Sequence, residues 1–269
     1  MSGAMLAIGL VVAAAAAVRS TWSPCGLSML SQITPVAESA RGNRFGRTAA
    51  WFVGGGVAGG LTFGLMMAVG AALTRAVNLT TTAGLVIVAG GALVTAALDA
   101  RVFGIGPPFL QRQVNEDWLS NYRPWVYGGG FGWQIGVGVS TYIMTAAVFL
   151  LIAVGVLGAD PAFAIVVGVT FGLLRGGAVL LGVPLRTTAA LLSFHRRFDA
   201  LTEPVRLTVI AVQLAIAVFA AWAGAGAVPA ALVAVIAAAL AVVAVRNPRP
   251  ARAAEPGPLP VGAAPALRR

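Results

Sequence analysis

The sequence predicts an all-α membrane protein of about seven transmembrane helices, built as two inverted three-helix repeats and one further C-terminal helix. Three observations predict this fold. Hydrophobic residues make up 59% of the 269-residue chain and charged residues only 10%, whereas a soluble domain carries roughly 25% charged residues. Apolar runs long enough to cross ~30 Å of hydrocarbon recur along the chain. Short glycine-rich motifs also recur between its two halves.

The expected spans begin with an interrupted helix from about Ala4 to Pro35, which breaks near Pro24 because proline removes a backbone donor. The next four spans cover about 48–73, 82–98, 127–157 and 161–183. The last apolar run, 207–245, would be ~58 Å long as one helix, so the glycines and Pro229 in its middle favour a hairpin of two short spans. A cleaved signal peptide is the less favoured alternative for the N-terminus, because no positive charge precedes its apolar core.

The arginines predict the orientation. All 18 basic residues are arginines, and 15 of them fall in alternate loops or the C-terminal tail. The positive-inside rule then places the N-terminus outside and the C-terminus in the cytoplasm, in a plasma (inner) membrane. The net charge of +10 therefore indicates topology, and no nucleic-acid partner is expected. The arginines of these segments are Arg41, Arg44, Arg47, Arg101, Arg112, Arg123, Arg186, Arg196, Arg197, Arg206, Arg246, Arg249, Arg252, Arg268 and Arg269.

These segments define the expected organisation. Residues 1–100 form the first three-helix repeat, and 101–126 form a cytoplasmic loop at the membrane interface. Residues 127–223 form the second repeat, with an amphipathic loop at 185–206 in which His195 is an interfacial polar residue. Residues 224–245 form the seventh helix, and 246–269 form a disordered tail rich in Pro, Ala and Arg.

The repeat is carried by two pairs of motifs. "GLTFGLMM" from Gly60 matches "GVTFGLLR" from Gly168, and both lie on Gly-x3-Gly ladders, which allow close helix contacts in lipid. A weaker pair is "STW" at Ser20–Trp22 and "STY" at Ser140–Tyr142. Units with an odd number of crossings are inverted relative to each other. Inverted repeats are typical of alternating-access proteins with a site at the repeat interface.

The single cysteine, Cys25, lies directly after the expected helix break. With Ser28 and Gln32 it forms a polar stripe at i, i+3 and i+7, which should face the bundle interior. Arg19, a turn and a half earlier, would favour a reactive thiolate, and a small buried hydrophobe is the alternative reading of Cys25. One cysteine excludes an intrachain disulfide, and neither a metal site nor a cofactor is expected from so few ligating residues.

Ser23, Pro24 and Cys25, followed by an apolar half-helix, resemble the transmembrane domain of the cytochrome c biogenesis and disulfide-reductant transporters (CcdA/DsbD type, LysE-like superfamily). The resemblance covers about 4–223. It implies that Cys25 is a redox thiol and that a thioredoxin-like protein is its partner. The family uses a second cysteine in the fourth span, where the repeat alignment places Thr145. A hydroxyl cannot form a disulfide, so the internal relay is not available to this chain.

A second set of residues favours transport. Arg175 lies in the middle of the fifth span, where an arginine costs at least ~2.5 kcal/mol, so Asp99, a backbone carbonyl or an aqueous cavity should accompany it. Arg175 and Arg19 would form a positive site for a small anionic or polar solute. Gln134, Thr141 and Thr145 on the fourth span would add hydrogen-bonding groups, as would Gln32.

Three functions therefore remain open: a protein related to the thiol relays, a transporter or exporter, and a membrane scaffold. Each is a multi-pass protein with the lipid bilayer as its first partner. No enzyme motif accompanies the lone thiol, so the sequence leans away from an enzyme. The three readings differ in which substitution should matter: Cys25 for a relay, Arg175 for a transporter, and neither for a scaffold.

Overall fold

The computed structural model describes residues 3–109 and 118–248, which form helices and no strand. The predicted all-α class is confirmed. In chain order the α-helices are α1 (Gly3–Ser20), α2 (Pro24–Gln32), α3 (Pro35–Ala40), α4 (Phe45–Ala76), α5 (Thr81–Asp99), α6 (Trp118–Asn121), α7 (Pro124–Gly136), α8 (Ala147–Leu157), α9 (Pro161–Gly177), α10 (Thr188–Ala200), α11 (Thr202–Ala225) and α12 (Ala227–Arg246), with short 3₁₀ helices η1 (Val102–Gly104) and η2 (Ala178–Gly182).

Within this described part, six helical stretches are long and apolar enough to cross a membrane: α1, α4, α5, α9 with η2, α11 and α12. The chain is thus a multi-pass membrane protein. The second, third and fifth predicted spans match α4, α5 and α9–η2 to within three residues at each end. The predicted hairpin is also confirmed, because α11 and α12 meet at Gly226, whose φ of 89° suits glycine.

The fourth span, predicted over 127–157 and long enough to tilt or kink, is not a single helix. The chain forms two half-helices there, α7 and α8, separated by the non-helical residues 137–146. The first span is broken as predicted, with α1 ending at Ser20 and α2 beginning at Pro24. Two broken spans are therefore present. The "STW" and "STY" motifs each lie at one of these breaks.

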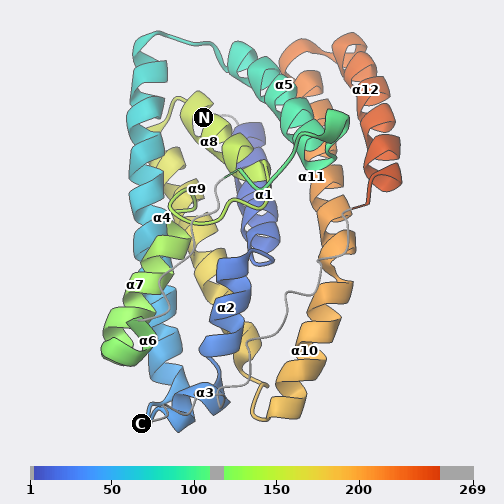
Figure 1. The fold of residues 1–269 in the computed structure, drawn as a ribbon. Helices are drawn as coiled ribbons and strands as arrows, with labels where there is room; N and C mark the ends of the chain where they lie inside the picture. The colour runs from blue at the N-terminus through green and yellow to red at the C-terminus, as the bar shows by residue number, and fades with distance from the viewer. Residues whose placement is uncertain (1–2, 110–117, 249–269) are drawn as a thin grey trace, which may run out of the picture.

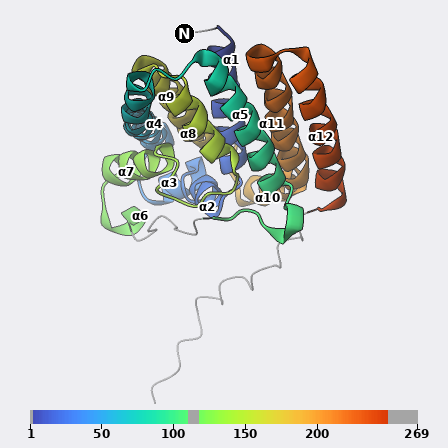
Figure 2. The same ribbon diagram turned by 90° about the horizontal axis from the view of Figure 1, so that it is seen from above.

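Helix α4 packs along α9 and α7, while α5, α11 and α12 form a group on the other side of α1 (Figure 1; Figure 2). Helix α12 lies at the outer edge and is only 17% buried over its most apolar window. Helices α3, α6 and α10 lie at one end of the bundle, opposite the described N-terminus (Figure 1). Helix α1 of the first broken span therefore lies between the two groups, whereas α7 of the second lies against α4 at the outer side of the bundle (Figure 2).

The predicted glycine ladders pack directly on each other. A Cβ on Gly60 would lie 2.5 Å from the Gly168 carbonyl oxygen and 2.8 Å from Gly172 Cα, and one on Gly168 would lie 2.5 Å from Gly64 Cα. Backbones in such contact leave no room for any side chain. The motif alignment pairs Gly60 with Gly168 and Gly64 with Gly172. The contact of Gly60 with Gly172 therefore corresponds to the contact of Gly168 with Gly64, as inverted repeats require. The division into repeats at 1–100 and 127–223 stays a prediction.

The remaining predicted segments are only partly described. The interfacial loop 101–126 contains η1, α6 and the start of α7, with residues 110–117 outside the described part. The amphipathic segment forms α10. The predicted disordered tail, 246–269, lies outside the described residues beyond 248.

Candidate functional site at the two helix breaks

The first break is closed by its own neighbours in sequence. The Ser23 hydroxyl accepts a hydrogen bond from the Gly26 backbone N–H at 3.1 Å and so caps α2. The Thr21 hydroxyl donates to the carbonyl of Ala17 at 3.1 Å, in the last turns of α1. Pro24 occupies the first helical position of α2, where no backbone donor is needed. Local capping therefore satisfies much of the polar backbone freed at this break.

The second break is held by an arginine from another helix. Arg175 of α9 is 2% exposed, and its Nη1 donates to the carbonyl of Ile135 at 2.8 Å. Its Nη2 donates to the Thr141 hydroxyl within the break at 3.4 Å. The guanidinium also lies 5.8 Å from the centre of the Phe171 ring, a cation–π contact. The prediction that Arg175 binds a backbone carbonyl is confirmed. The prediction that it pairs with Asp99 is wrong.

Asp99, at the end of α5, caps α8 from outside its own segment. Its Oδ1 accepts from the backbone N–H of Ala146 at 2.8 Å. Its Oδ2 accepts from the Thr145 hydroxyl at 2.5 Å and from Gln213 Nε2 at 2.8 Å. A carboxylate is favourable at a helix N-terminus because the first N–H groups lack partners in the helix. The predicted site residue Thr145 is thus part of a structural cap that joins α5, α8 and α11.

Two of the buried arginines, Arg19 and Arg175, each lie near another ionisable side chain. Arg19 is 1% exposed and lies within electrostatic range of Asp99, and Arg175 lies within electrostatic range of Cys25. Neither of the two ion pairs found among residues 3–109 and 118–248 involves Arg175.

Cys25 lies against a small cavity rather than at the surface. Its side chain is buried, and with Ser28, Gln32 and Ile135 it lines a cavity of about 10 Å³, enough for about one water molecule. The predicted polar stripe on α2 does face the interior. The cavity reaches Ile135, whose carbonyl binds Arg175. No group of three or more His, Cys, Asp or Glu side chains suited to a metal occurs among the described residues.

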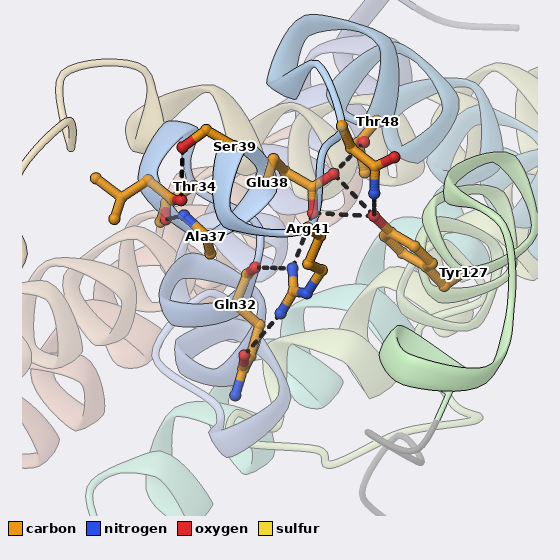
Figure 3. Close-up of polar contacts among 10 residues, drawn as sticks. Gln32, Thr34, Ala37, Glu38, Ser39, Arg41, Thr48 and Tyr127 are labelled. Atoms are coloured by element: carbon orange, nitrogen blue, oxygen red, sulfur yellow. Dashed lines mark hydrogen bonds and ion pairs between the residues drawn. The ribbon is translucent and has the colours of Figure 1, made fainter.

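A second buried carboxylate lies at the end of the bundle formed by α3 and the start of α4 (Figure 3). Glu38 is fully buried and accepts from the hydroxyls of Thr48 and Tyr127 at 2.5 and 2.8 Å. Arg41 Nη1 lies 2.9 Å from Glu38 Oε1. Arg41 also donates to the backbone carbonyl and side-chain oxygen of Gln32, at 2.8 and 3.2 Å. Gln32, predicted to bind solute, therefore also ties α2 to this network.

Helix α10 attaches to the first broken span. The rings of Trp22 and Phe198 stack at 4.1 Å, and Trp22 Nε1 donates to the Phe198 carbonyl at 2.8 Å. His195 Nε2 lies 3.0 Å from the Ser31 hydroxyl. These contacts tie the predicted interfacial helix to α2.

Sequence reasoning placed some site residues well and missed others. Gln134 contributes its backbone carbonyl, which accepts from Ser140 at 2.6 Å. Gln213 was missed, and Asp99 was considered only as a partner for Arg175. Both are polar residues within or at the end of apolar helices, a signal that marks functional or structural sites in membranes. Glu38 gave no such signal, because it lies in a predicted loop.

The chain is similar to curated proteins that are named for methylamine utilisation. It is 30% identical over 177 residues to "Methylamine utilization protein MauF" of Paracoccus versutus, an alignment that spans 65% of each chain and so falls just short of two thirds of that relative. The protein of the same name from Paracoccus denitrificans is 29% identical over 74% of this chain and 73% of its own length. That of Methylorubrum extorquens is 28% identical over 56% and 54%. No family model and no solved structure matches.

The resemblance to the cytochrome c biogenesis family was wrong. The four curated relatives, at 28–30% identity, all have the name MauF and none is named as a thiol-disulfide transporter. The three residues Ser23, Pro24 and Cys25 carried that resemblance. In the structure Ser23 and Pro24 have a local capping role, which any broken helix needs.

Proposed function

We propose that the chain is a plasma-membrane protein that supports methylamine utilisation by moving a small anionic or polar solute, with Arg175 at the solute site. The name shared by the relatives supports the first part of the proposal. The observation that carries the second part is the buried Arg175 guanidinium, which lies on the broken fourth span. Broken helices line the substrate sites of many transporters, because the backbone freed at the breaks can bind solutes.

The charge of this region favours a negatively charged group. Three buried arginines, Arg19, Arg175 and Arg206, lie in or beside this region; Arg206 forms an ion pair with Glu203, and the other two accompany one buried carboxylate, Asp99. Asp99 already accepts three hydrogen bonds at α8 and α11. The excess positive charge is on Arg175, whose side chain donates to neutral oxygens. A carboxylate or similar anion would replace the weak 3.4 Å contact to Thr141 with a charged one.

Access to Arg175 is proposed to run along α2. The cavity beside Cys25 and Gln32 ends at Ile135, the residue whose carbonyl Arg175 binds. The Arg41 contacts to Gln32 and Glu38 close the end of this route. A movement of α2 away from α7 would widen the cavity, which at about 10 Å³ is too small for a solute. The arginine-rich end is assigned to the cytoplasm by the positive-inside rule.

Growth on methylamine tests this function. A Paracoccus denitrificans strain that lacks its own relative would receive this chain or its variants. We expect growth to be restored by the unchanged chain and by Cys25→Ser, and lost with Arg175→Gln. Arg175→Lys should restore growth only in part, because lysine keeps the charge and loses the paired donors. Membrane levels of each variant, measured by immunoblot, separate loss of function from loss of protein.

The variants also separate the alternatives. Full growth with Arg175→Gln at normal membrane levels would overturn the solute site and leave a scaffold. Loss of growth with Cys25→Ser, together with a mixed disulfide trapped on Cys25, would instead show thiol chemistry with a thioredoxin-like partner. A failure of the unchanged chain to restore growth would overturn the assignment to methylamine utilisation.

A further inference from the structure

An open groove lies at the arginine-rich end of the bundle, where the start of α4 meets η2. Its volume is about 700 Å³, far larger than the cavity at Cys25. Its walls are apolar: the side chains of Phe45, Ala49, Val53, Leu180 and Val183. Leu180 and Val183 are 53% and 44% exposed. Apolar side chains exposed on membrane helices face lipid, so an acyl chain suits this groove.

The polar side of the groove carries positive charge. Arg186 lines it and is exposed. Arg44 and Arg47 are also exposed and flank Phe45 and Gly46, which both line the groove. The lining contains no acidic residue. A ligand that complements this groove has an apolar chain and a negatively charged head.

We infer that the groove binds an anionic phospholipid, with an acyl chain along the walls and the phosphate beside Arg186. Basic pockets between helices at the cytoplasmic face recognise anionic headgroups in this way. A soluble anion would not use the apolar walls, and a neutral lipid would gain nothing from Arg186. The inference does not depend on the solute proposed for Arg175, because the groove shares no residue with that site.

Two matched pairs of variants test the inference. Gly46→Leu places a side chain in the groove, and Gly54→Leu makes the same change on the same helix at a position outside the groove lining. A Cβ at either glycine has no atom within 4 Å, and leucine favours a helix over glycine, so both variants should fold. Arg186→Gln removes the charge at the groove, and Arg75→Gln removes an exposed arginine from the last turn of α4, at the other end of that helix.

The measurement is native mass spectrometry of the full chain, titrated with phosphatidylglycerol or phosphatidylcholine. We expect one phosphatidylglycerol to bind the unchanged chain more tightly than phosphatidylcholine. Arg186→Gln should lower affinity for phosphatidylglycerol about fivefold and leave phosphatidylcholine unchanged. Gly46→Leu should lower affinity for both lipids at least about tenfold, since it fills the groove.

Specific outcomes would overturn the inference. If the unchanged chain bound phosphatidylglycerol and phosphatidylcholine equally tightly, the groove would not recognise the negative charge of the headgroup. Equal losses in Gly46→Leu and Gly54→Leu, or in Arg186→Gln and Arg75→Gln, would show that lipid binds without regard to this groove. Thermal unfolding of each variant without lipid identifies any variant that is unstable.

Discussion

The two broken spans solve the same problem in different ways. The first break is short, between Ser20 and Pro24, and its polar groups are capped by Ser23 and Thr21 from the same segment. The second spans residues 137–146 and is held by side chains of α5, α9 and α11. Unpaired backbone groups are costly in lipid, so a break needs partners. Local partners permit a short break, whereas tertiary partners permit a long one that can carry a site.

The strongest test of this contrast is Asp99→Ala. It removes an acceptor from Ala146, Thr145 and Gln213 at once and leaves Arg19 without its opposite charge. Breaking a buried charged network costs about 3–5 kcal/mol, so we expect a loss of this size in the free energy of unfolding. Thermal and denaturant unfolding in detergent, followed by circular dichroism, measures it.

Asp160→Ala is the matched control. Asp160 also caps a helix, α9, by accepting from the N–H of Ala162 at 3.0 Å, but this bond is exposed and local. Its loss should cost about 1 kcal/mol. If Asp99→Ala and Asp160→Ala lowered the free energy of unfolding by similar amounts, the tertiary cap of α8 would stabilise the fold no more than a local cap.

Two glycine-to-alanine substitutions come next in size. A Cβ on Gly136, the last residue of α7, would lie 2.3 Å from the Gly56 carbonyl oxygen on α4. A Cβ on Gly26 would lie 2.2 Å from the carbonyl oxygen of Thr21, in its own break. Each substitution should cost about 1–3 kcal/mol by overpacking. Only Gly136→Ala should move two helices apart, because only its clash is between helices.

Distances between spin labels on α4 and α7, in a Cys25→Ser background, distinguish the two effects. Gly136→Ala should lengthen the α4–α7 distance, and Gly26→Ala should leave it unchanged. Lengthening in both variants would mean that the first break is coupled to the second and is not local.

Ser23→Ala should have a small effect, of the same size as that of Asp160→Ala. Loss of a single N-cap bond, from Gly26 N–H to the Ser23 hydroxyl, costs about 1 kcal/mol. Faster hydrogen exchange should be confined to the first turn of α2. Ser23→Asp supplies another capping oxygen and should restore slow exchange. Faster exchange in α8 would contradict the local character of this break.

The same contrast explains which predictions succeeded. The break near Pro24 and the turn at Gly226 were predicted because proline and glycine act through the local backbone. The break in the fourth span was missed because residues 137–146 contain no proline, and Gly138, at φ 77°, is its only glycine. The polar stripe of Cys25, Ser28 and Gln32 lines an interior cavity as predicted, since its helical spacing is local too.

By itself, the sequence determined a helical membrane protein with most of its span boundaries, the first break, and glycine ladders ready for close packing. Apolar run length, proline geometry and glycine size are properties of short segments. Only the tertiary structure decided that Asp99 of α5 caps α8, that Arg175 holds the fourth-span break, and that Glu38 is buried beside Tyr127. Those contacts join residues between 40 and 89 positions apart. Which distant donor meets which freed carbonyl depends on how the helices pack, and no local pattern records it.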